Sequence, residues 1–337
     1  MYSVADNGLV ASGKLEENSK TNSNSRGPIP DLRDFSKQEL QNFLDSFDTI
    51  LSDCDGVLWS CHTPIKGSLA ALKELQEMGK NVYFVSNNST LSIDNFVKKL
   101  ERLGFPAKKH QVVVPSLVVA WYLTSIDFKG EAFVVGTTAF KNVLRDAGVK
   151  ISTCDPELVD EDLGAVVEAL KDYPGVKAII HDFDPNASWM KIMRSVISLR
   201  RDDCIFIAAA MDALVPVGAK YPLLGTKLFT DVVSQTVGRQ PILTAKPSQL
   251  LKEYVFKNCD LNGAERTVFV GDTITQDAKF ASLCGFKKMF VTSGVATLED
   301  ALKEEEARPD IWIPSLGDFL PLFEGLNSGQ NSSDQSL

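Results

Sequence analysis

The sequence lacks the features of secreted, membrane-spanning and nucleic-acid-binding proteins. It has no basic start followed by an apolar run, so no signal peptide is visible, and no apolar stretch approaches the roughly 20 residues that cross a bilayer. Lys and Arg number 35 against 44 Asp and Glu, and the net charge of −9 repels nucleic acids and anionic lipids. We therefore expect a cytoplasmic protein with no nucleic-acid partner and no membrane partner.

Cysteine is scarce and scattered. Six cysteines occur, and no two of them stand at C-x-x-C spacing. Disulfide frameworks are typical of short secreted chains, whereas this chain has 337 residues and no visible export signal. We therefore expect reduced, unpaired thiols.

The composition and the hydrophobic pattern predict an α/β protein of more than one domain. Hydrophobic residues make up 44% of the chain, which suffices for a sizeable core. Both ends are polar and aperiodic, so we predict disordered tails at 1–34 and 327–337. Short apolar runs alternate with amphipathic ones in 35–127 and again in 240–326, which predicts a Rossmann-like parallel sheet with helices on both faces. The segment 128–239 is predicted to be a second α/β unit inserted into this core.

The expected strands are short apolar runs bounded by polar residues or glycine. In the core they are Phe47–Leu51, Asn81–Val85, Thr267–Val270 and Lys288–Val291. In the inserted segment they are Ala132–Val135, Ala165–Val167, Lys177–Ile180 and Cys204–Ile207.

Carboxylates follow two of the core strands. Asp53 and Asp55 come directly after the first strand, and Asp272 follows Thr267–Val270, with Asp277 a short turn later. Ligands bind outside the carboxyl ends of the strands in open parallel sheets. Carboxylates packed at one such edge repel each other unless a divalent cation holds them, and oxygen ligands of this kind suit Mg²⁺.

The other polar groups at this edge suit an anionic substrate. Ser86, Asn87 and Asn88 follow the second strand. Ser86 and nearby backbone N–H groups would bind phosphate oxygens, while Lys246 would neutralise developing charge. A carboxylate nucleophile splits phosphate-ester hydrolysis into two steps through an acyl phosphate, and a second carboxylate acts as general acid and base. The residues therefore predict a magnesium-dependent phosphatase acting on a small phosphorylated metabolite.

Four segments, in this order, resemble the four motifs of the haloacid dehalogenase (HAD) superfamily. They are Asp-Cys-Asp-Gly-Val-Leu-Trp at 53–59, Ser-Asn-Asn-Ser at 86–89, Lys-Pro-Ser at 246–248 and Gly-Asp at 271–272. The Gly-Val-Leu-Trp ending and the large insertion between the second and third motifs are similar to phosphoglycolate phosphatase, pyridoxal phosphatase (chronophin) and 4-nitrophenylphosphatase. The resemblance covers about residues 45 to 325.

The resemblance implies a role for each residue of these motifs. It makes Asp53 the nucleophile, Asp55 the general acid and base, and Lys246 the residue that orients nucleophile and phosphate. The implied phosphate-binding residues are Ser86, Asn87 and Asn88, together with Lys246.

The resemblance also implies a metal site and a cap. The implied Mg²⁺ ligands are Asp53, the backbone carbonyl of Asp55, and Asp272, with Asp277 in or next to that shell. The inserted segment becomes a cap that closes over the site, with Met211 and Asp212 facing the substrate. Caps of this type often pair with each other, which implies a homodimer.

Two motifs depart from the family's pattern. The fourth motif usually reads Gly-Asp-Arg-Leu-x-Thr-Asp, and here Thr273 stands where arginine is expected. In the cap, the usual Ala-Thr-Asn-x-Asp becomes Ala-Ala-Ala-Met-Asp at 208–212. The catalytic groups are intact and the substrate-facing loop is changed, which favours a phosphatase with a different or looser substrate choice.

Three other functions remain open from the sequence. One is a non-catalytic descendant that binds a phosphorylated ligand or a protein, and another is a phosphotransferase whose acceptor is not water. The third is a protein phosphatase, although an inserted cap would hinder large substrates.

Overall fold

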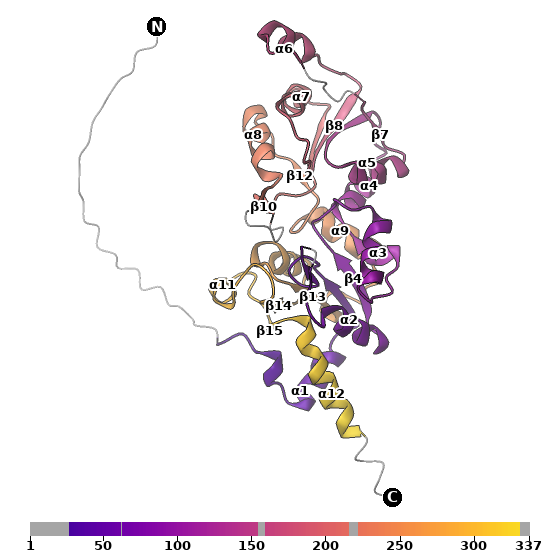
Figure 1. Cartoon of the computed structure of the whole chain (residues 1–337), viewed down its shortest axis with the longest axis vertical. Coiled ribbons are helices and arrows are strands. Elements are labelled where there is room, and N and C mark those ends of the chain that lie inside the picture. The colour runs from indigo at the N-terminus through magenta and orange to yellow at the C-terminus, as the bar shows by residue number, and fades with distance from the viewer. Residues whose placement is uncertain (1–26, 62, 154–158, 216–221, 331–337) are drawn as a thin grey trace, which may run out of the picture.

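Two parallel sheets, stacked along the long axis of the molecule, organise the chain (Figure 1). The computed structural model describes residues 27–61, 63–153, 159–215 and 222–330. We call the described parts of 27–113 and 246–330 the core lobe and those of 115–244 the cap lobe. None of the described helices is both long and apolar enough to cross a membrane.

The core lobe contains a six-stranded sheet in the order β15-β14-β13-β1-β4-β5, in which every neighbouring pair is parallel. This arrangement confirms the predicted Rossmann-like sheet. Its strands are β1 (Thr49–Ser52), β4 (Asn81–Val85), β5 (Val112–Val113), β13 (Thr267–Gly271), β14 (Lys287–Val291) and β15 (Ile311–Ile313).

The register of the central strand gathers the candidate site. Ser52 of β1 lies between Val270 of β13 and Phe84 of β4. The residues that follow these three positions therefore leave the sheet at one edge, as the carboxyl ends of parallel strands do. All four β1 side chains are buried, with Ile50 and Leu51 facing opposite sides of the sheet.

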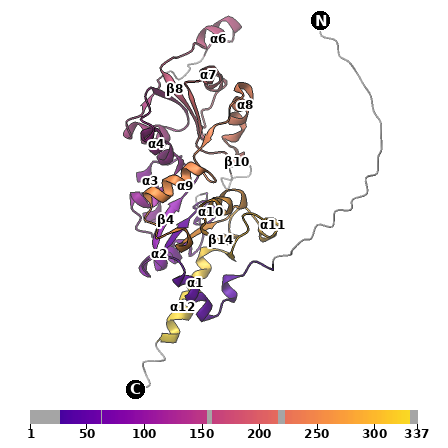
Figure 2. The ribbon, with the colours of Figure 1, turned by 180° about the vertical axis from the view of Figure 1, so that it is seen from behind.

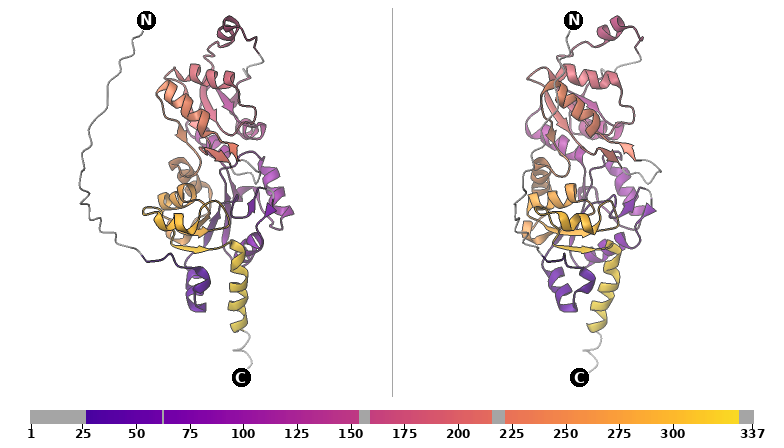
Figure 3. Two further views of the ribbon diagram at one scale, coloured as in Figure 1. Left: turned by 60° about the vertical axis from the view of Figure 1, so that its left-hand side comes forward. Right: turned by 90° about the vertical axis from the view of Figure 1, so that its left-hand side faces the viewer.

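Helices cover both faces of the core sheet because each face is apolar. On the Ile50 side pack α1 (Lys37–Asp45), α2 (Ser68–Glu77), α3 (Ile93–Arg102) and α12 (Phe319–Gln330). On the other side lie α9 (Gln249–Asn258), α10 (Lys279–Cys284) and α11 (Leu298–Lys303). Figure 3 shows α12 running from the core lobe away from the cap lobe.

The cap lobe contains a five-stranded parallel sheet in the order β12-β9-β8-β6-β7. Its strands are β6 (Glu131–Val135), β7 (Lys150–Ile151), β8 (Val176–His181), β9 (Ile205–Ala208) and β12 (Ile242–Leu243). One face carries α4 (Pro115–Ser125) and α5 (Thr138–Asp146), and the other carries α7 (Trp189–Leu199) and α8 (Lys227–Val237). A further helix, α6 (Leu163–Ala169), projects at the far end (Figure 1).

Small elements complete the description. Two hairpins pair antiparallel: β2 (Trp59–Ser60) with β3 (Thr63–Pro64), and β10 (Leu214–Val215) with β11 (Leu223–Leu224). Short helices are η1 (Leu32–Asp34), η2 (Lys109–Gln111), η3 (Ala264–Arg266), η5 (Leu316–Asp318) and the π-helical turn η4 (Ile274–Ala278). The five cysteines within the described residues are all free.

The lobes meet through α4 and α9, which lie together between them (Figure 2). Trp121 of α4 packs edge-on against Tyr254 of α9, with ring centroids 5.8 Å apart. Val118 of α4 faces the core cluster, whereas Val119 faces the cap cluster. This helix therefore contributes to the hydrophobic cores of both lobes.

The structure corrects one predicted strand. Residues 165–167 belong to the helix α6 and not to a strand. Asp162 caps this helix by accepting the backbone N–H of Ala165, and Val167 is 65% exposed. A three-residue apolar run carries too little period to distinguish strand from helix, and here the capping aspartate decides for the helix.

Three predicted boundaries also shift. Residues 29–34 are packed, because Ile29 and Leu32 are buried and Asp31 pairs with Trp312 of β15, so the predicted tail at 1–34 is too long. Helix α12 continues to residue 330, beyond the predicted start of the tail at 327. The strand β12 pairs with β9 and extends the cap sheet past residue 239. The remainder of both predicted tails, 1–26 and 331–337, lies outside the described residues.

Candidate active site

Three buried carboxylates meet at the carboxyl edge of the core sheet. One oxygen each of Asp53, Asp272 and Asp277 lies within 4.8 Å of the other two. Asp53 follows β1, Asp272 follows β13, and Asp277 belongs to the turn η4. Residues that the sequence separates by more than 200 positions are thus brought together by strand register, as predicted.

Lys246 lies among these carboxylates. Its Nζ donates to Asp53 Oδ1 at 2.7 Å, to Asp277 Oδ1 at 2.8 Å and to the carbonyl oxygen of Val85 at 3.0 Å. Burial alone would lower the pKa of Lys246, but the carboxylates of Asp277 and Asp53 outweigh burial and raise that pKa. The ammonium group therefore stays charged and donates a hydrogen bond to one oxygen of Asp53 and to one oxygen of Asp277.

The cluster has an excess of negative charge when its groups are ionised, since three carboxylates face one ammonium group. Burial, followed by the charge of Asp277, raises the pKa of both Asp53 and Asp272. Asp272 Oδ1 is buried and has no hydrogen-bond partner among the described residues. A buried carboxylate oxygen in this state is typical of a metal ligand.

Two glycines allow the chain to close around Asp272. A Cβ at Gly56, where φ is +89°, would lie 2.3 Å from Asp272 Oδ2, and one at Gly294 would lie 1.9 Å from the same atom. No side chain fits at either position without displacing the carboxylate. The backbone N–H of Val295 donates to Asp272 Oδ2 at 2.7 Å and holds it in place.

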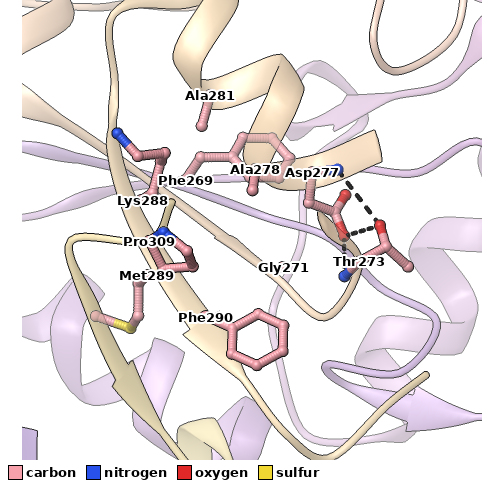
Figure 4. A pocket seen from close by; sticks show the side chains of 10 residues that line it. All are labelled: Phe269, Gly271, Thr273, Asp277, Ala278, Ala281, Lys288, Met289, Phe290 and Pro309. Carbon is pink, nitrogen blue, oxygen red and sulfur yellow. Dashed lines mark hydrogen bonds between the residues drawn. The ribbon is translucent and has the colours of Figure 1, made fainter. Parts of the chain in front are cut away.

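Thr273, which stands where the HAD pattern has arginine, orients Asp277. Its hydroxyl and its backbone N–H donate to Asp277 Oδ2 at 2.7 and 3.0 Å (Figure 4). The backbone N–H of Asp272 donates to the same oxygen at 3.2 Å. Asp277 Oδ1 is thereby left for Lys246.

Two hollows near these strands are not the reaction site. The cavity in Figure 4, behind Asp277 and Phe290, has a volume of about 10 Å³, which is the room of a single water molecule. A larger groove of about 740 Å³ lies at the opposite edge of the sheet, beside Val268, Lys287 and Ile311 at the starts of β13, β14 and β15. The carboxylate cluster is at the other end of these strands, where ligands bind in such sheets.

Asp55 lies apart from the three-carboxylate cluster and has its own partners. Its Oδ1 accepts the indole Nε1–H of Trp59 at 2.9 Å, and Lys99 Nζ lies 3.6 Å from the centroid of that indole. Burial raises the pKa of Asp55, and the charge of Lys99 opposes this effect. A carboxyl group that keeps its proton more readily suits a general acid.

The predicted phosphate-binding residues form a loop after β4. Ser86 is buried, and its Oγ accepts the backbone N–H of Asn88 at 3.1 Å. Asn87 Oδ1 accepts the backbone N–H of Lys246 at 2.9 Å, which joins the second and third motifs. Asn88 Oδ1 accepts from both the backbone and the hydroxyl of Thr90, so its oxygen stabilises the loop itself.

Comparison with known proteins agrees with this geometry. Residues 50–150 match the model of haloacid dehalogenase-like hydrolases, and residues 243–319 match a second model, of HAD-hydrolase-like proteins. Human glycerol-3-phosphate phosphatase is 32% identical over 308 residues, which cover 86% of this chain and 95% of that protein. The chain belongs to the haloacid dehalogenase-like hydrolases.

Two further relatives show which branch of the HAD hydrolases is similar. Human chronophin is 30% identical over 300 residues, covering 85% of this chain and 96% of chronophin. The crystal structure of a 4-nitrophenylphosphatase from Thermotoga maritima superposes with a TM-score of 0.69 at 25% identity, covering 82% of this chain and 97% of that one. These relatives confirm the predicted resemblance and identify this HAD hydrolase as a phosphatase, a phosphoric monoester hydrolase.

The cap of this HAD phosphatase touches the core site through Asp212. Gln276 Nε2, in the turn η4, donates to Asp212 Oδ1 at 2.5 Å, and Met211 beside it is half-buried. Contact of Asp212 and Met211 with substrate stays a prediction. Gln276 was missed from the sequence, although its place directly before Asp277 in the fourth motif was a usable signal.

Asp182 is a second residue that the sequence did not single out. It directly follows the carboxyl end of β8, the central strand of the cap sheet, and is 1% exposed. Neither of its carboxylate oxygens has a hydrogen-bond partner among the described residues. Burial, together with the charges of Asp212 and Asp184, raises the pKa of Asp182 to about 7, against a smaller opposing effect of the backbone N–H of Phe183.

We expect Asp182→Asn to stabilise the protein at pH 8. The folded state holds the Asp182 proton up to about pH 7, whereas the unfolded state releases it near 3.8, so stability falls as pH rises through this window. This pKa difference corresponds to at most about 4 kcal/mol, and removing the charge should recover about 1–4 kcal/mol at pH 8. Urea unfolding of both proteins at pH 4.5, 6 and 8 measures the gain in the free energy of unfolding. A gain that does not shrink towards pH 4.5 would contradict the assignment of this effect to the charge of Asp182.

Proposed function

We propose that this HAD phosphatase hydrolyses small-molecule phosphate monoesters with Mg²⁺, through an aspartyl phosphate formed on Asp53. The observation that carries the proposal is the 2.7 Å contact of Lys246 with Asp53 inside a buried cluster of three carboxylates. Such a cluster is costly to bury for structural purposes alone, and strongly perturbed carboxylates at a sheet edge are typical of catalytic sites.

The chain's own residues divide the reaction into two steps. Lys246 holds Asp53 Oδ1, which leaves Oδ2 to attack phosphorus. A bond forms between this oxygen and phosphorus, the ester P–O bond breaks, and Asp55 gives its proton to the leaving oxygen. Water then attacks the aspartyl phosphate and loses a proton to Asp55, which releases inorganic phosphate and regenerates Asp53.

The carboxylate cluster fits a magnesium ion. Asp272 Oδ1 is buried with no hydrogen-bond partner in the described part of the chain, and both oxygens of Asp277 already accept hydrogen bonds. In agreement with the ligand set that the family resemblance implies, Asp53, the backbone carbonyl of Asp55, and Asp272 would hold the ion directly, with Asp277 next to that shell. When bound, the ion would offset the charge repulsion between Asp53 and the substrate phosphate. Ser86, Asn87, Asn88 and Lys246 would bind the phosphate oxygens.

The substrate is proposed to be a small phosphorylated metabolite, phosphoglycolate-like, pyridoxal phosphate or related. The cap lobe lies against the core site, and the full-length relatives include glycerol-3-phosphate phosphatase and chronophin. A cap in this place excludes large substrates. A homodimer formed through the cap and a cytoplasmic location remain predictions.

We expect hydrolysis of 4-nitrophenyl phosphate by the purified protein to require Mg²⁺. Turnover should fall to the background rate in EDTA and return when excess Mg²⁺ is added, since without the cation the carboxylates repel the phosphate. Initial rates with and without EDTA measure this, and undiminished turnover after exhaustive chelation contradicts the metal proposal.

Absence of turnover with 4-nitrophenyl phosphate, acetyl phosphate and phosphoglycolate would favour the binding-only descendant. Faster product formation on adding an alcohol acceptor would favour a phosphotransferase.

A further inference from the structure

A chain of hydrogen bonds links the cap to two catalytic loops. Gln276 Nε2 donates to Asp212 Oδ1 of the cap at 2.5 Å, and Gln276 Oε1 accepts Asn87 Nδ2 at 3.0 Å. Asn87 Oδ1 in turn accepts the backbone N–H of Lys246 at 2.9 Å. The chain thus runs from the cap, through the turn that bears Asp277, to the phosphate-binding loop and the catalytic lysine.

Asp212 determines the orientation of the Gln276 amide, and Gln276 and the Lys246 backbone together determine that of Asn87. An ionised Asp212 can only accept hydrogen bonds, so Gln276 must present its NH₂ group to it. Gln276 then has only its oxygen left for Asn87, and Asn87 must present its NH₂ group there. The backbone of Lys246 favours the same orientation of Asn87, because its carbonyl accepts Asn87 Nδ2 at 3.3 Å and its N–H donates to Asn87 Oδ1 at 2.9 Å.

Gln276 connects the cap loop at 209–213 to the core lobe by a hydrogen bond. It directly precedes Asp277, whose two oxygens contact Lys246 and Thr273. Among the described residues, no other hydrogen bond that the structure shows joins residues 209–213 of the cap to the core lobe. A change in the position of the cap loop therefore reaches Asn87 through Gln276.

We propose that Gln276 is a positioning residue that couples closure of the cap over Asp53 to the placement of Asn87 in the phosphate-binding loop. The inference rests on the proposed function and adds a coupling to it. The phosphate loop reaches its binding geometry when Asp212 is seated on Gln276, so a substrate that holds the cap loop away also loses phosphate contacts. Substrate selection by the cap thereby acts on the phosphate end of the substrate as well.

The test is a set of substitutions that break and rebuild the chain. Gln276→Glu places a carboxylate against Asp212 and removes the donor, and we expect kcat/KM for 4-nitrophenyl phosphate to fall at least tenfold. In an Asp212→Asn background the same substitution regains a complementary pair, because the new amide donates to the new carboxylate. There we expect Gln276→Glu to cost less than threefold. Gln276→Met leaves the side chain uncharged but removes both hydrogen bonds. It should lower kcat/KM about tenfold, both in the wild type and in the Asp212→Asn background.

Gln41 provides a matched control. Its Nε2 donates to Asp45 Oδ1 at 3.0 Å within the exposed helix α1, far from the cap (Figure 1). Gln41→Glu and Gln41→Met should leave kcat/KM within twofold of the wild type. An equal cost of Gln276→Glu in both backgrounds, or no cost of Gln276→Met, would overturn the coupling.

A second readout does not need turnover. Inorganic phosphate with Mg²⁺ should raise the melting temperature of the wild type, and this shift should be at least halved in Gln276→Met but unchanged in Gln41→Met. Absent turnover with an intact, Gln276-dependent phosphate shift would reject the proposed hydrolysis while keeping the coupling. Normal turnover with a phosphate shift that is equal in all variants would reject the coupling and keep the hydrolysis.

Discussion

Asp53→Asn should lower kcat for 4-nitrophenyl phosphate by at least about 10³-fold. The amide is nearly the same shape as the carboxylate but is too weak a nucleophile to form an acyl phosphate. It also removes one of the two carboxylate charges, those of Asp53 and Asp272, that would hold Mg²⁺ directly. Steady-state rates at saturating Mg²⁺ measure the loss, and thermal unfolding checks that the variant is folded.

The control for this variant is Asp34→Asn, which changes an exposed aspartate of η1 distant from the cluster. Its kcat should equal that of the wild type within about twofold, since surface substitutions have small effects. If Asp53→Asn retained more than a tenth of the wild-type rate, Asp53 would not be the nucleophile.

Lys246→Met should damage both activity and stability. The substitution leaves Asp53 and Asp277 buried without the ammonium group that each contacts at 2.7 and 2.8 Å. Removing one partner of a buried ion pair costs about 3–5 kcal/mol because the remaining charge stays uncompensated. We expect the free energy of unfolding to fall by about that amount. We also expect kcat to fall at least about 10²-fold, since in the proposed reaction the lysine would stabilise the transferring phosphoryl group.

Lys80→Met is a suitable comparison for the stability measurement. Lys80 Nζ is half-buried and donates to the backbone carbonyls of Leu44 and Phe47, without a carboxylate contact. Its loss should cost about 1–2 kcal/mol and leave kcat unchanged. Urea unfolding of both variants separates the cases, and a Lys246→Met protein as stable as the wild type would show that the carboxylates relax to share protons or solvent.

The position of the catalytic groups could be predicted because it depends on regular structure. Once β1, β4 and β13 are recognised as parallel neighbours, the residues that follow them must leave one edge of the sheet. Asp53, Ser86 and Asp272 each follow such a strand, and their proximity is a consequence of register rather than of side-chain detail. The charge argument for a cation adds no structural assumption beyond that proximity.

The features that were missed depend on contacts between distant side chains. Gln276 is defined by its bond to Asp212, 64 residues away, and composition offers no sign of it. Asp182 is unusual only because the folded cap buries its carboxylate with no hydrogen-bond partner among the residues that the structure describes. The polar segment near Asp31 was predicted to be disordered, yet it pairs with Trp312, 281 residues along the chain. Each of these results from tertiary packing, which overrides local propensity.

The junction of the lobes limits how this protein can be divided for engineering. Only Thr244 and Ala245 separate β12, the edge strand of the cap sheet, from Lys246, and the Thr244 N–H donates to the carbonyl of Ala208 at 3.2 Å. A transplant of residues 128–239 would leave this strand behind and strip α4 from the apolar face that it covers. An exchangeable cap module therefore runs from about residue 115 to 244. Such an exchange joins the new cap to the core only two residues before the position of Lys246, the proposed catalytic lysine.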